Sequence, residues 1–146
     1  MSDIDRLYES IKELEGSGIY VSTAKGRFLV HVSVRDDDVG RRVGYQGRKK
    51  PLGPSEGMLF VFPQDAHHSM WMRDTYIPLD MIFIDKKWKI VDISHDVKPA
   101  AAESIYPSSP CRYVLEVGGK WCKDRGVVVG DMIEQNLSRT YKNAKV

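Results

Sequence analysis

The first segment of the chain carries apolar residues at spacings of three, four and three, as an amphipathic helix requires. These residues are Ile4, Leu7, Ile11 and Leu14. Ser2 is suited to cap the start of this helix, and Gly16-Ser17-Gly18 is suited to end it. The pattern therefore predicts a helix over residues 2–15, within an N-terminal extension of residues 1–17.

After residue 18 the apolar pattern changes from helical to strand-like. Between residues 28 and 34, four large apolar residues alternate with Leu29, His31 and Ser33, which is the period of two of a half-buried strand. Other runs are rich in β-branched and aromatic residues, which are typical of strands. The predicted strands are residues 19–23, 28–34, 58–62, 69–72, 80–84, 88–94, 111–117 and 131–134. Short helical turns are predicted at 36–43 and 120–125.

These elements predict a mainly β (α+β) fold class. About eight short strands are separated by turn signals, and only one or two short helices accompany them. Because strands and helices do not alternate regularly, a doubly wound parallel sheet is disfavoured. We expect a small antiparallel β-barrel-like domain at residues 18–134, preceded by the helical extension and followed by a polar, basic tail at 135–146.

Composition and charge agree with one soluble domain. The 146 residues are 42% hydrophobic and carry a formal net charge of +2, which is too balanced to indicate nucleic acid or a membrane by itself. The acidic start lacks the features of an export signal, and no apolar run approaches the roughly 20 residues that cross a bilayer. We expect a cytoplasmic protein without membrane contact, without a cofactor and with an open oligomeric state.

Two acids stand out because each lies in an apolar strand pattern. Asp80 is flanked by Leu79 and Met81, so it is either exposed or buried with hydrogen-bond partners. Glu116 lies in a similar setting, and Arg73 and Thr75 are natural polar neighbours. If Asp80 and Glu116 face each other across a cavity, they form an acid/base pair with separated pKa values. The alternative is that Asp80 is a structural acid that ties a turn to a strand.

Other classes of site find less support in the sequence. Adjacent His67 and His68 would point to opposite faces of a strand, and no zinc or nucleotide motif is present, so we predict no metal site. Cys111 and Cys122 are expected to be reduced thiols. Five cations and no acid occur between residues 41 and 50. This basic stretch is either a solvated loop or a surface for phosphates or an acidic partner.

Several separated motifs carry a family resemblance. They are Gly57-Met58-Leu59-Phe60-Val61-Phe62, Trp71-Met72-Arg73-Asp74-Thr75, Ile77-Pro78-Leu79-Asp80-Met81-Ile82-Phe83-Ile84-Asp85, Tyr106-Pro107-Ser108, Tyr113-Val114-Leu115-Glu116-Val117, and Gly126 with Gly130-Asp131. From roughly residue 28 to 134, the chain resembles domain-of-unknown-function family 192, an uncharacterised family of small, mainly β domains. The resemblance implies the fold but no reaction, and it implies that Trp71, Thr75, Asp80 and Glu116 line a site.

Two stretches depart from the family pattern. The family usually has Gly-Leu-Met, one residue and then Arg, whereas this chain has Gly44-Tyr45-Gln46-Gly47-Arg48. Arg73-Asp74 stands where Lys-Asn is commoner before the threonine. These changes alter polarity and charge, so the ligand preference of relatives does not transfer directly to this chain.

The sequence favours a binding module for a small molecule, a peptide or a protein partner. Its candidate ligand-binding residues are Trp71, Arg73, Thr75, Asp80 and Glu116. One alternative is a hydrolase-like enzyme that uses Asp80 and Glu116 as an acid/base pair. Another is a docking or oligomerising protein that uses the N-terminal helix and the basic stretch. Nucleic-acid binding is the least favoured of these readings.

Overall fold

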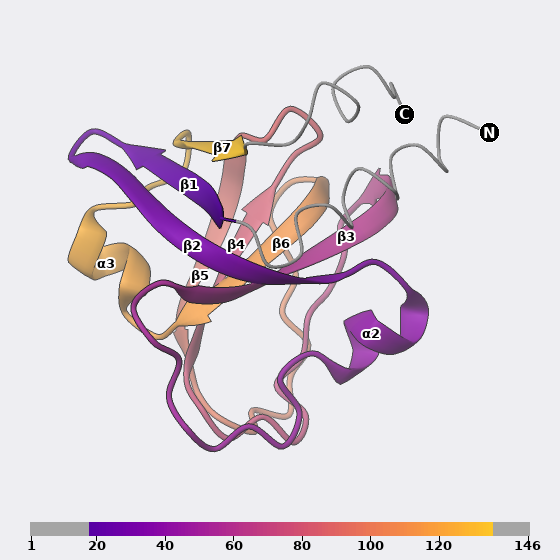
Figure 1. Cartoon of the computed structure of the whole chain (residues 1–146). Coiled ribbons are helices and arrows are strands. Elements are labelled where there is room, and N and C mark those ends of the chain that lie inside the picture. Colours follow the sequence, from indigo (N-terminus) through magenta and orange to yellow (C-terminus); the bar gives the residue numbers. More distant parts are fainter. Residues whose placement is uncertain (1–17, 136–146) are drawn as a thin grey trace.

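Seven strands form one curled sheet, a half-barrel, in the computed structural model (Figure 1), which describes residues 18–135. The strands follow the order β5-β4-β6-β3-β2-β1-β7 across the sheet. Their bounds are β1 Gly18–Thr23, β2 Gly26–Arg35, β3 Glu56–Ala66, β4 Leu79–Ile84, β5 Ile90–Val97, β6 Cys111–Gly118 and β7 Met132–Gln135. The predicted mainly β class is confirmed. The predicted helix at 2–15 and the tail from residue 136 lie outside the described residues.

Two short helices accompany the sheet, both at predicted positions. They are α2, Asp38–Val43, and α3, Trp121–Arg125. The Asp37 carboxylate caps α2 by accepting a hydrogen bond from the Gly40 amide at 2.6 Å. Gly126, with φ of 70°, ends α3 in a left-handed conformation. In the described part of the chain, no helix has both the length and the apolar character needed to cross a membrane.

One strand pair differs from the antiparallel prediction. β2 and β3 run parallel, with Val32 opposite Gly57, while the other five pairs are antiparallel. Between these two strands the chain passes through α2 and returns to the starting end of the sheet, as a parallel pair requires. The expected antiparallel arrangement therefore holds for the other five pairs and is wrong for β2 and β3, so the sheet is mixed.

The predicted strand at 69–72 does not form. Met70 makes a single bridge with Ile105, in which each amide donates to the other residue's carbonyl at 2.8 Å. The bridge does not extend into a ladder, since Pro107 and Pro110 soon follow and lack amide protons. The apolar residues that suggested a strand anchor a loop to the sheet instead.

Hydrogen bonds beside Trp88 join the two edges of the curled sheet. The Ile90 amide donates to the Asp131 carbonyl at 2.8 Å, and the Ile133 amide donates to the Trp88 carbonyl at 2.8 Å. The start of β5 is thus bonded to the start of β7, although these strands are at opposite ends of the sheet order. This contact holds the curl around an apolar interior.

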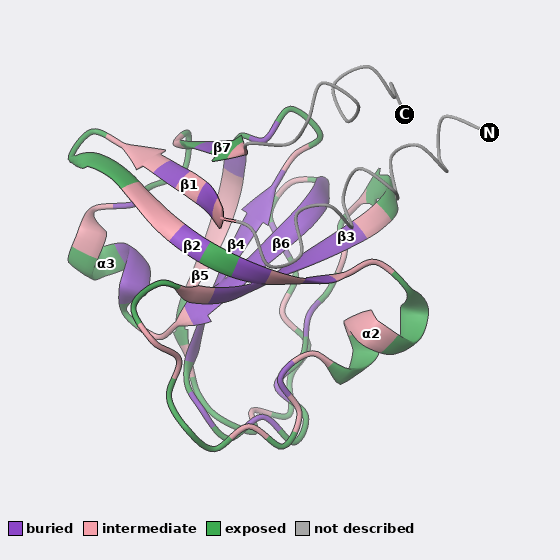
Figure 2. Cartoon of the chain, in the orientation of Figure 1, coloured by how far each residue is buried: buried purple, intermediate pink, exposed green. Residues whose placement is uncertain are grey.

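The two faces of the sheet bury separate apolar cores. The first core takes residues from all seven strands and from α3, including Ile82 and Leu115. The second takes Met58, Met81 and other residues of β3, β4 and β6, together with side chains from loops. β4 and β6 are buried over nearly their whole length (Figure 2), because both of their faces are covered. The loops that cover the second core gather at one end of the molecule (Figure 1).

Gly57 lies in β3, the central strand of the sheet, where neighbouring backbones approach closely. A Cβ atom there would lie 2.8 Å from Val30 Cγ1 and 2.9 Å from the backbone oxygen of Glu116. We expect Gly57→Ala to lower the free energy of unfolding by about 1–3 kcal/mol, because a ladder carbonyl cannot move aside without cost. Urea unfolding followed by tryptophan fluorescence measures this change. Gly53→Ala is the control, since its Cβ would meet nothing closer than 3.9 Å; equal losses in both variants would contradict the steric explanation.

Candidate functional site

A cavity of about 230 Å³ lies over the second core. Its walls come from β3, from β6, from α2 with the turn that follows, and from the loops around residues 69–75 and 104. The aromatic and polar part of its lining includes Tyr45, Phe60, Phe62, Trp71, Thr75 and Glu116, and the arginines and serines of the lining are Arg41, Arg42, Ser69 and Ser104. Three of the five predicted ligand-binding residues, Trp71, Thr75 and Glu116, therefore line one cavity.

Glu116 is the acid of this cavity. On the sheet it lies between Met58 of β3 and Met81 of β4, which are its direct partners in the two ladders. The residue is only 3% exposed, and its carboxyl group has no hydrogen bond or ion pair within residues 18–135. Burial raises the pKa of the Glu116 carboxyl from its ordinary value of 4.5 to about 8. The group is therefore largely protonated at neutral pH.

The loop at residues 69–75 brings Trp71 and Thr75 to the cavity. The Trp71 indole Nε1 donates to the carbonyl oxygen of Arg42 at 3.2 Å, which joins this loop to α2. Thr75 is buried, and its hydroxyl donates to the carbonyl oxygen of Arg73 at 3.2 Å. Between them, Asp74 adopts a positive φ of 52°, a conformation that Asp tolerates better than most residues. The tight turn directs the Thr75 side chain inward.

A glycine turn after α2 places Tyr45 against the same cavity. Gly44 has φ 47° and ψ −126°, a combination that residues with a Cβ rarely adopt. A Cβ there would also come within 3.3 Å of the Phe60 ring. Burial raises the pKa of the Tyr45 hydroxyl, and the nearby Glu116 carboxyl raises it further. Tyr45 is thus held as a neutral phenol beside Glu116.

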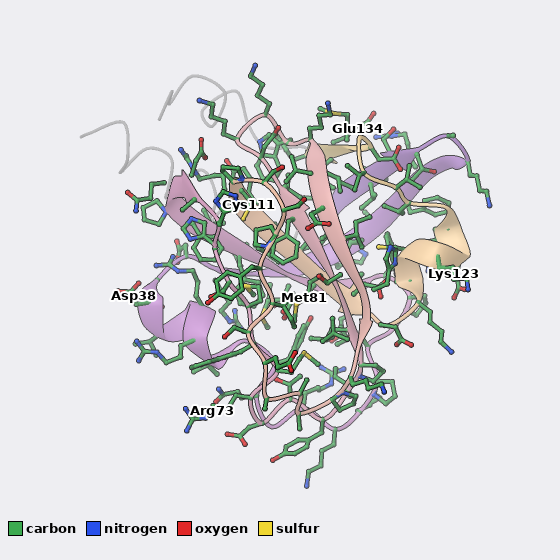
Figure 3. The ribbon with its side chains drawn as sticks, turned by 180° about the vertical axis from the view of Figure 1, so that it is seen from behind. Asp38, Arg73, Met81, Cys111, Lys123 and Glu134 are labelled. Carbon is green, nitrogen blue, oxygen red and sulfur yellow. The ribbon has the colours of Figure 1, made fainter. Side chains whose placement is uncertain are left out.

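Arg73 does not line this cavity, although the sequence grouped it with the candidate ligands. Its guanidinium lies over the Trp71 ring, 5.7 Å from the ring centroid, and it borders a separate depression with residues 100–102. Figure 3 shows Arg73 at the periphery, whereas Met81 lies near the middle of the molecule. Arg73 therefore covers the outside of the cavity wall.

Asp80 and Glu116 lie on opposite faces of the sheet. In the β4–β6 ladder Asp80 is opposite Val117, while Glu116 is opposite Met81. Directly paired residues share a face, and the next residue on each strand points the other way. The predicted acid/base pair is therefore wrong, because the sheet itself separates the two carboxyl groups.

Asp80 is a structural carboxylate. It is fully buried, and one of its oxygens accepts hydrogen bonds from the amides of Asp96 at 2.7 Å and Lys120 at 3.0 Å. The other oxygen accepts from the Cys122 amide at 2.8 Å. Lys120 has a left-handed φ of 73°, so that the first amides of α3 point toward the carboxylate. Asp80 thus ties β4 to the end of β5 and to α3.

The two cysteines are buried free thiols, as the sequence predicted. Burial raises the pKa of the Cys111 thiol to about 11. Burial also raises the pKa of the Cys122 thiol, and the neighbouring Asp80 carboxylate adds to this effect. Neither thiol is a reactive thiolate at neutral pH. Among residues 18–135, no group of three or more His, Cys, Asp or Glu residues is placed to hold a metal ion.

The cations of the basic stretch are not equivalent. Arg41 donates to the Val61 carbonyl at 2.7 Å, and Arg48 forms an ion pair with Glu56 at 3.0 Å. Arg42 lines the cavity and is exposed. The Arg42 guanidinium has no hydrogen bond or ion pair with the described part of the chain. The structure thus places one uncompensated cation at the cavity.

Comparison with known proteins agrees with this fold. Residues 20–135 match the family DUF192, which is described as "Uncharacterized ACR". The chain belongs to DUF192. The resemblance seen in the sequence motifs is therefore confirmed, and the match begins somewhat earlier than residue 28. No curated protein matches this DUF192 chain.

Two solved structures are similar to this DUF192 domain. A protein of unknown function from Novosphingobium aromaticivorans is 27% identical, with a TM-score of 0.78 over 81% of this chain and 84% of that chain. A candidate transcription regulator from Sinorhizobium meliloti is 34% identical, with a TM-score of 0.77 over 80% of this chain and 91% of that chain. These relatives support the fold and assign no ligand to the cavity.

Sequence reasoning missed several residues of this DUF192 site. Arg42 appeared only within the basic stretch, Tyr45 only in stretches singled out for charge or for departure from the family pattern, and Phe60 only within a strand and a family motif. A glycine followed by an aromatic residue, Gly44-Tyr45, is the one local signal that could have drawn attention to this turn. No periodic pattern connects the turn to Glu116, which is far away in the chain.

Removing one charged acceptor should show the structural role of Asp80. We expect Asp80→Asn to lower the free energy of unfolding by about 2–3 kcal/mol, because an amide nitrogen would face a backbone N–H and the charge would be lost. Urea denaturation measures the effect. Asp124→Asn is the matched control, since Asp124 is exposed on α3 and its carboxylate has no partner within residues 18–135. A loss no larger than that of the control would refute the assigned role.

Glu116 should make stability depend on pH. Between pH 4.5 and 8 the unfolded chain ionises this carboxyl while the folded chain keeps it protonated. The free energy of unfolding should therefore fall as pH rises, by up to about 1.4 kcal/mol per unit, and level off above pH 8. Glu116→Gln cannot ionise and should lack this decrease, whereas Glu103→Gln, at an exposed position, should retain it. Urea unfolding at pH 5, 6, 7 and 8 compares the slopes, and parallel curves for wild type and Glu116→Gln would exclude the effect.

Proposed function

We propose that this DUF192 domain is a binding module that holds a small molecule in the Glu116 cavity. The observation that carries the proposal is a carboxyl group that is almost fully buried, faces a cavity and has no partner within residues 18–135. Hydrogen bonds to charged groups contribute about 1.5–3 kcal/mol. A ligand that offers such a partner to the Glu116 carboxyl at the cavity would gain affinity from it.

The size and lining of the cavity support a small ligand. Its volume of about 230 Å³ is below the roughly 300–1,000 Å³ of pockets for drug-sized molecules. Tyr45, Phe60 and Trp71 offer apolar and aromatic contact, while Thr75 and Glu116 offer polar groups. Mostly apolar walls with a few fixed polar groups are typical of ligand sites.

The other readings have less support. The enzyme hypothesis relied on an acid pair that the sheet separates, and docking through the N-terminal helix involves residues outside the described range. The Sinorhizobium relative is described as a candidate transcription regulator, but nucleic-acid binding is weakly supported for this chain because Arg41 and Arg48 are engaged in contacts within the domain. The expected cytoplasmic location stays a prediction.

Methionine methyl groups provide a direct test of binding. Met70 lines the cavity, Met58 and Met81 flank Glu116, and Met132 lies on β7, outside the cavity lining. With ¹³C-labelled methionine methyls, a screen of small metabolites should yield ligands that shift Met70, Met58 and Met81 saturably. The Met132 signal should not move.

Two serine variants separate binding in the cavity from binding elsewhere. Ser104→Phe adds a ring at the cavity lining and should abolish the shifts. Ser55→Phe adds the same ring at an exposed turn outside this cavity and should leave them unchanged. The proposed function would be overturned if no compound of the screen shifted the methyl signals, or if Ser104→Phe bound the ligands unchanged.

A further inference from the structure

We propose that the ligand is a small zwitterion, whose ammonium group pairs with the Glu116 carboxylate and whose anionic group meets Arg42. This inference rests on the proposed function, because it names the chemistry of the molecule that would fill the same cavity. It follows from the different charges and surroundings at the two parts of the site.

The surroundings of Glu116 suit a cation. Among the described residues that line the cavity, Glu116 is the one acid. Four aromatic side chains share the lining with it, namely Tyr45, Phe60, Phe62 and Trp71. Ammonium groups are attracted both to a carboxylate and to aromatic faces, and the attraction grows when water is excluded. A small primary amine or a methylated ammonium would satisfy all of these groups at once.

The arginines of α2 argue against a simple amine. Arg41 also borders the cavity, with its guanidinium 5.3 Å from the Phe62 ring centroid, although its hydrogen bonds to Val61 and Asp38 partly engage it. Arg42 borders the cavity without such partners. Two guanidinium groups would repel a ligand that is only a cation. An anionic group on the ligand removes this repulsion and gives Arg42 a partner, whereas a simple anion would leave Glu116 unpaired.

Proton exchange distinguishes an ammonium ligand from a neutral one. In the free protein at neutral pH the Glu116 carboxyl holds its proton, so pairing with an ammonium releases one proton to solvent and changes no other bond. The affinity for an ammonium must therefore rise with pH until Glu116 is ionised in the free protein. A neutral carbonyl ligand that accepts a hydrogen bond from the protonated carboxyl would bind more weakly as pH rises.

The other residues that line the cavity do not produce this dependence, and His68, which stacks on the outer side of Phe62, is unchanged in Glu116→Gln. The flanking residues of β3 and β4, Met58 and Met81, carry no titratable group. Tyr45 stays protonated because burial raises the pKa of its hydroxyl. Arg41 and Arg42 keep their charge over the same range. A proton-linked affinity between pH 6 and 8 that Glu116→Gln abolishes would therefore report on Glu116.

The probes are glycine, β-alanine, 4-aminobutanoate and 5-aminopentanoate, which differ only in the distance between ammonium and carboxylate. Butylamine and butanoate are the matched probes that carry one charge each, and butanamide is the neutral probe. Titrations followed by the Met70 methyl signal should show one zwitterion binding at least tenfold more tightly than these three. Its affinity should rise about tenfold from pH 6 to 7 and level off above pH 8.

Three variants assign the two ends of the ligand. Glu116→Gln should weaken binding of the zwitterion at least tenfold at pH 8 and abolish the pH dependence. Arg42→Gln should reduce zwitterion affinity to the level of butylamine without weakening butylamine itself, and Arg42→Lys should restore part of the loss. Lys87→Gln removes an exposed cation in the turn between β4 and β5, away from the cavity, and should change neither affinity.

The outcomes separate this inference from the proposed function. Tightest binding of butanamide, affinity that falls as pH rises, or zwitterion binding that survives both Glu116→Gln and Arg42→Gln would overturn the zwitterion proposal. The zwitterion proposal would also fail if none of the seven probes shifted the Met70 signal while the metabolite screen found other ligands in the cavity. That result would leave the proposed function standing. If neither the probes nor the screen produced a shift, the zwitterion proposal and the proposed function would both be overturned.

Discussion

The alternation of side chains along β6 and β4 is the constraint on which the rest of this structure depends. Glu116 and Val117 are neighbours in the chain, yet they point to opposite sides of the sheet and pair with Met81 and Asp80. On one side Asp80 accepts three backbone amides and fixes the start of α3. On the other side Glu116 has no partner in the described chain. A single ladder register therefore gives two buried acids opposite properties.

The two faces of the sheet are covered in different ways, and this difference locates the site. One face is covered by the curled sheet itself, since all seven strands contribute to that core. The other face is covered by loops and by the turn after α2, which pack around Met58 and Met81. The cavity lies on this loop-covered face, against Phe60 of β3 and Glu116 of β6. A cavity on the loop-covered face is consistent with binding residues carried by loops on a rigid scaffold.

Most of the secondary structure was predictable because short strands have a local signature. Seven of the predicted strands and both short helices are present close to their expected residues. The segment at 69–72 has the same local composition, but no neighbouring strand extends its single bridge at Met70. The parallel direction of β2 and β3 was also missed, because it depends on the path of a long connection. For the site, Thr75 and Glu116 were found as polar residues in apolar surroundings and Trp71 through the family resemblance, whereas Arg42 and Tyr45 come from α2 and the turn after it, which carry no periodic pattern.

By itself, the sequence determined the class of the fold, the positions of its strands and the fact that two acids lie in apolar strand patterns. Only the tertiary structure decided which acid faces a cavity and which is a structural anchor. The physical reason is that the face on which a side chain lies depends on the register between strands that are far apart in the chain. A shift of one residue would move every side chain of a strand to the other face of the sheet. Residue types therefore identify Asp80 and Glu116 as significant, while the β4–β6 ladder separates their roles.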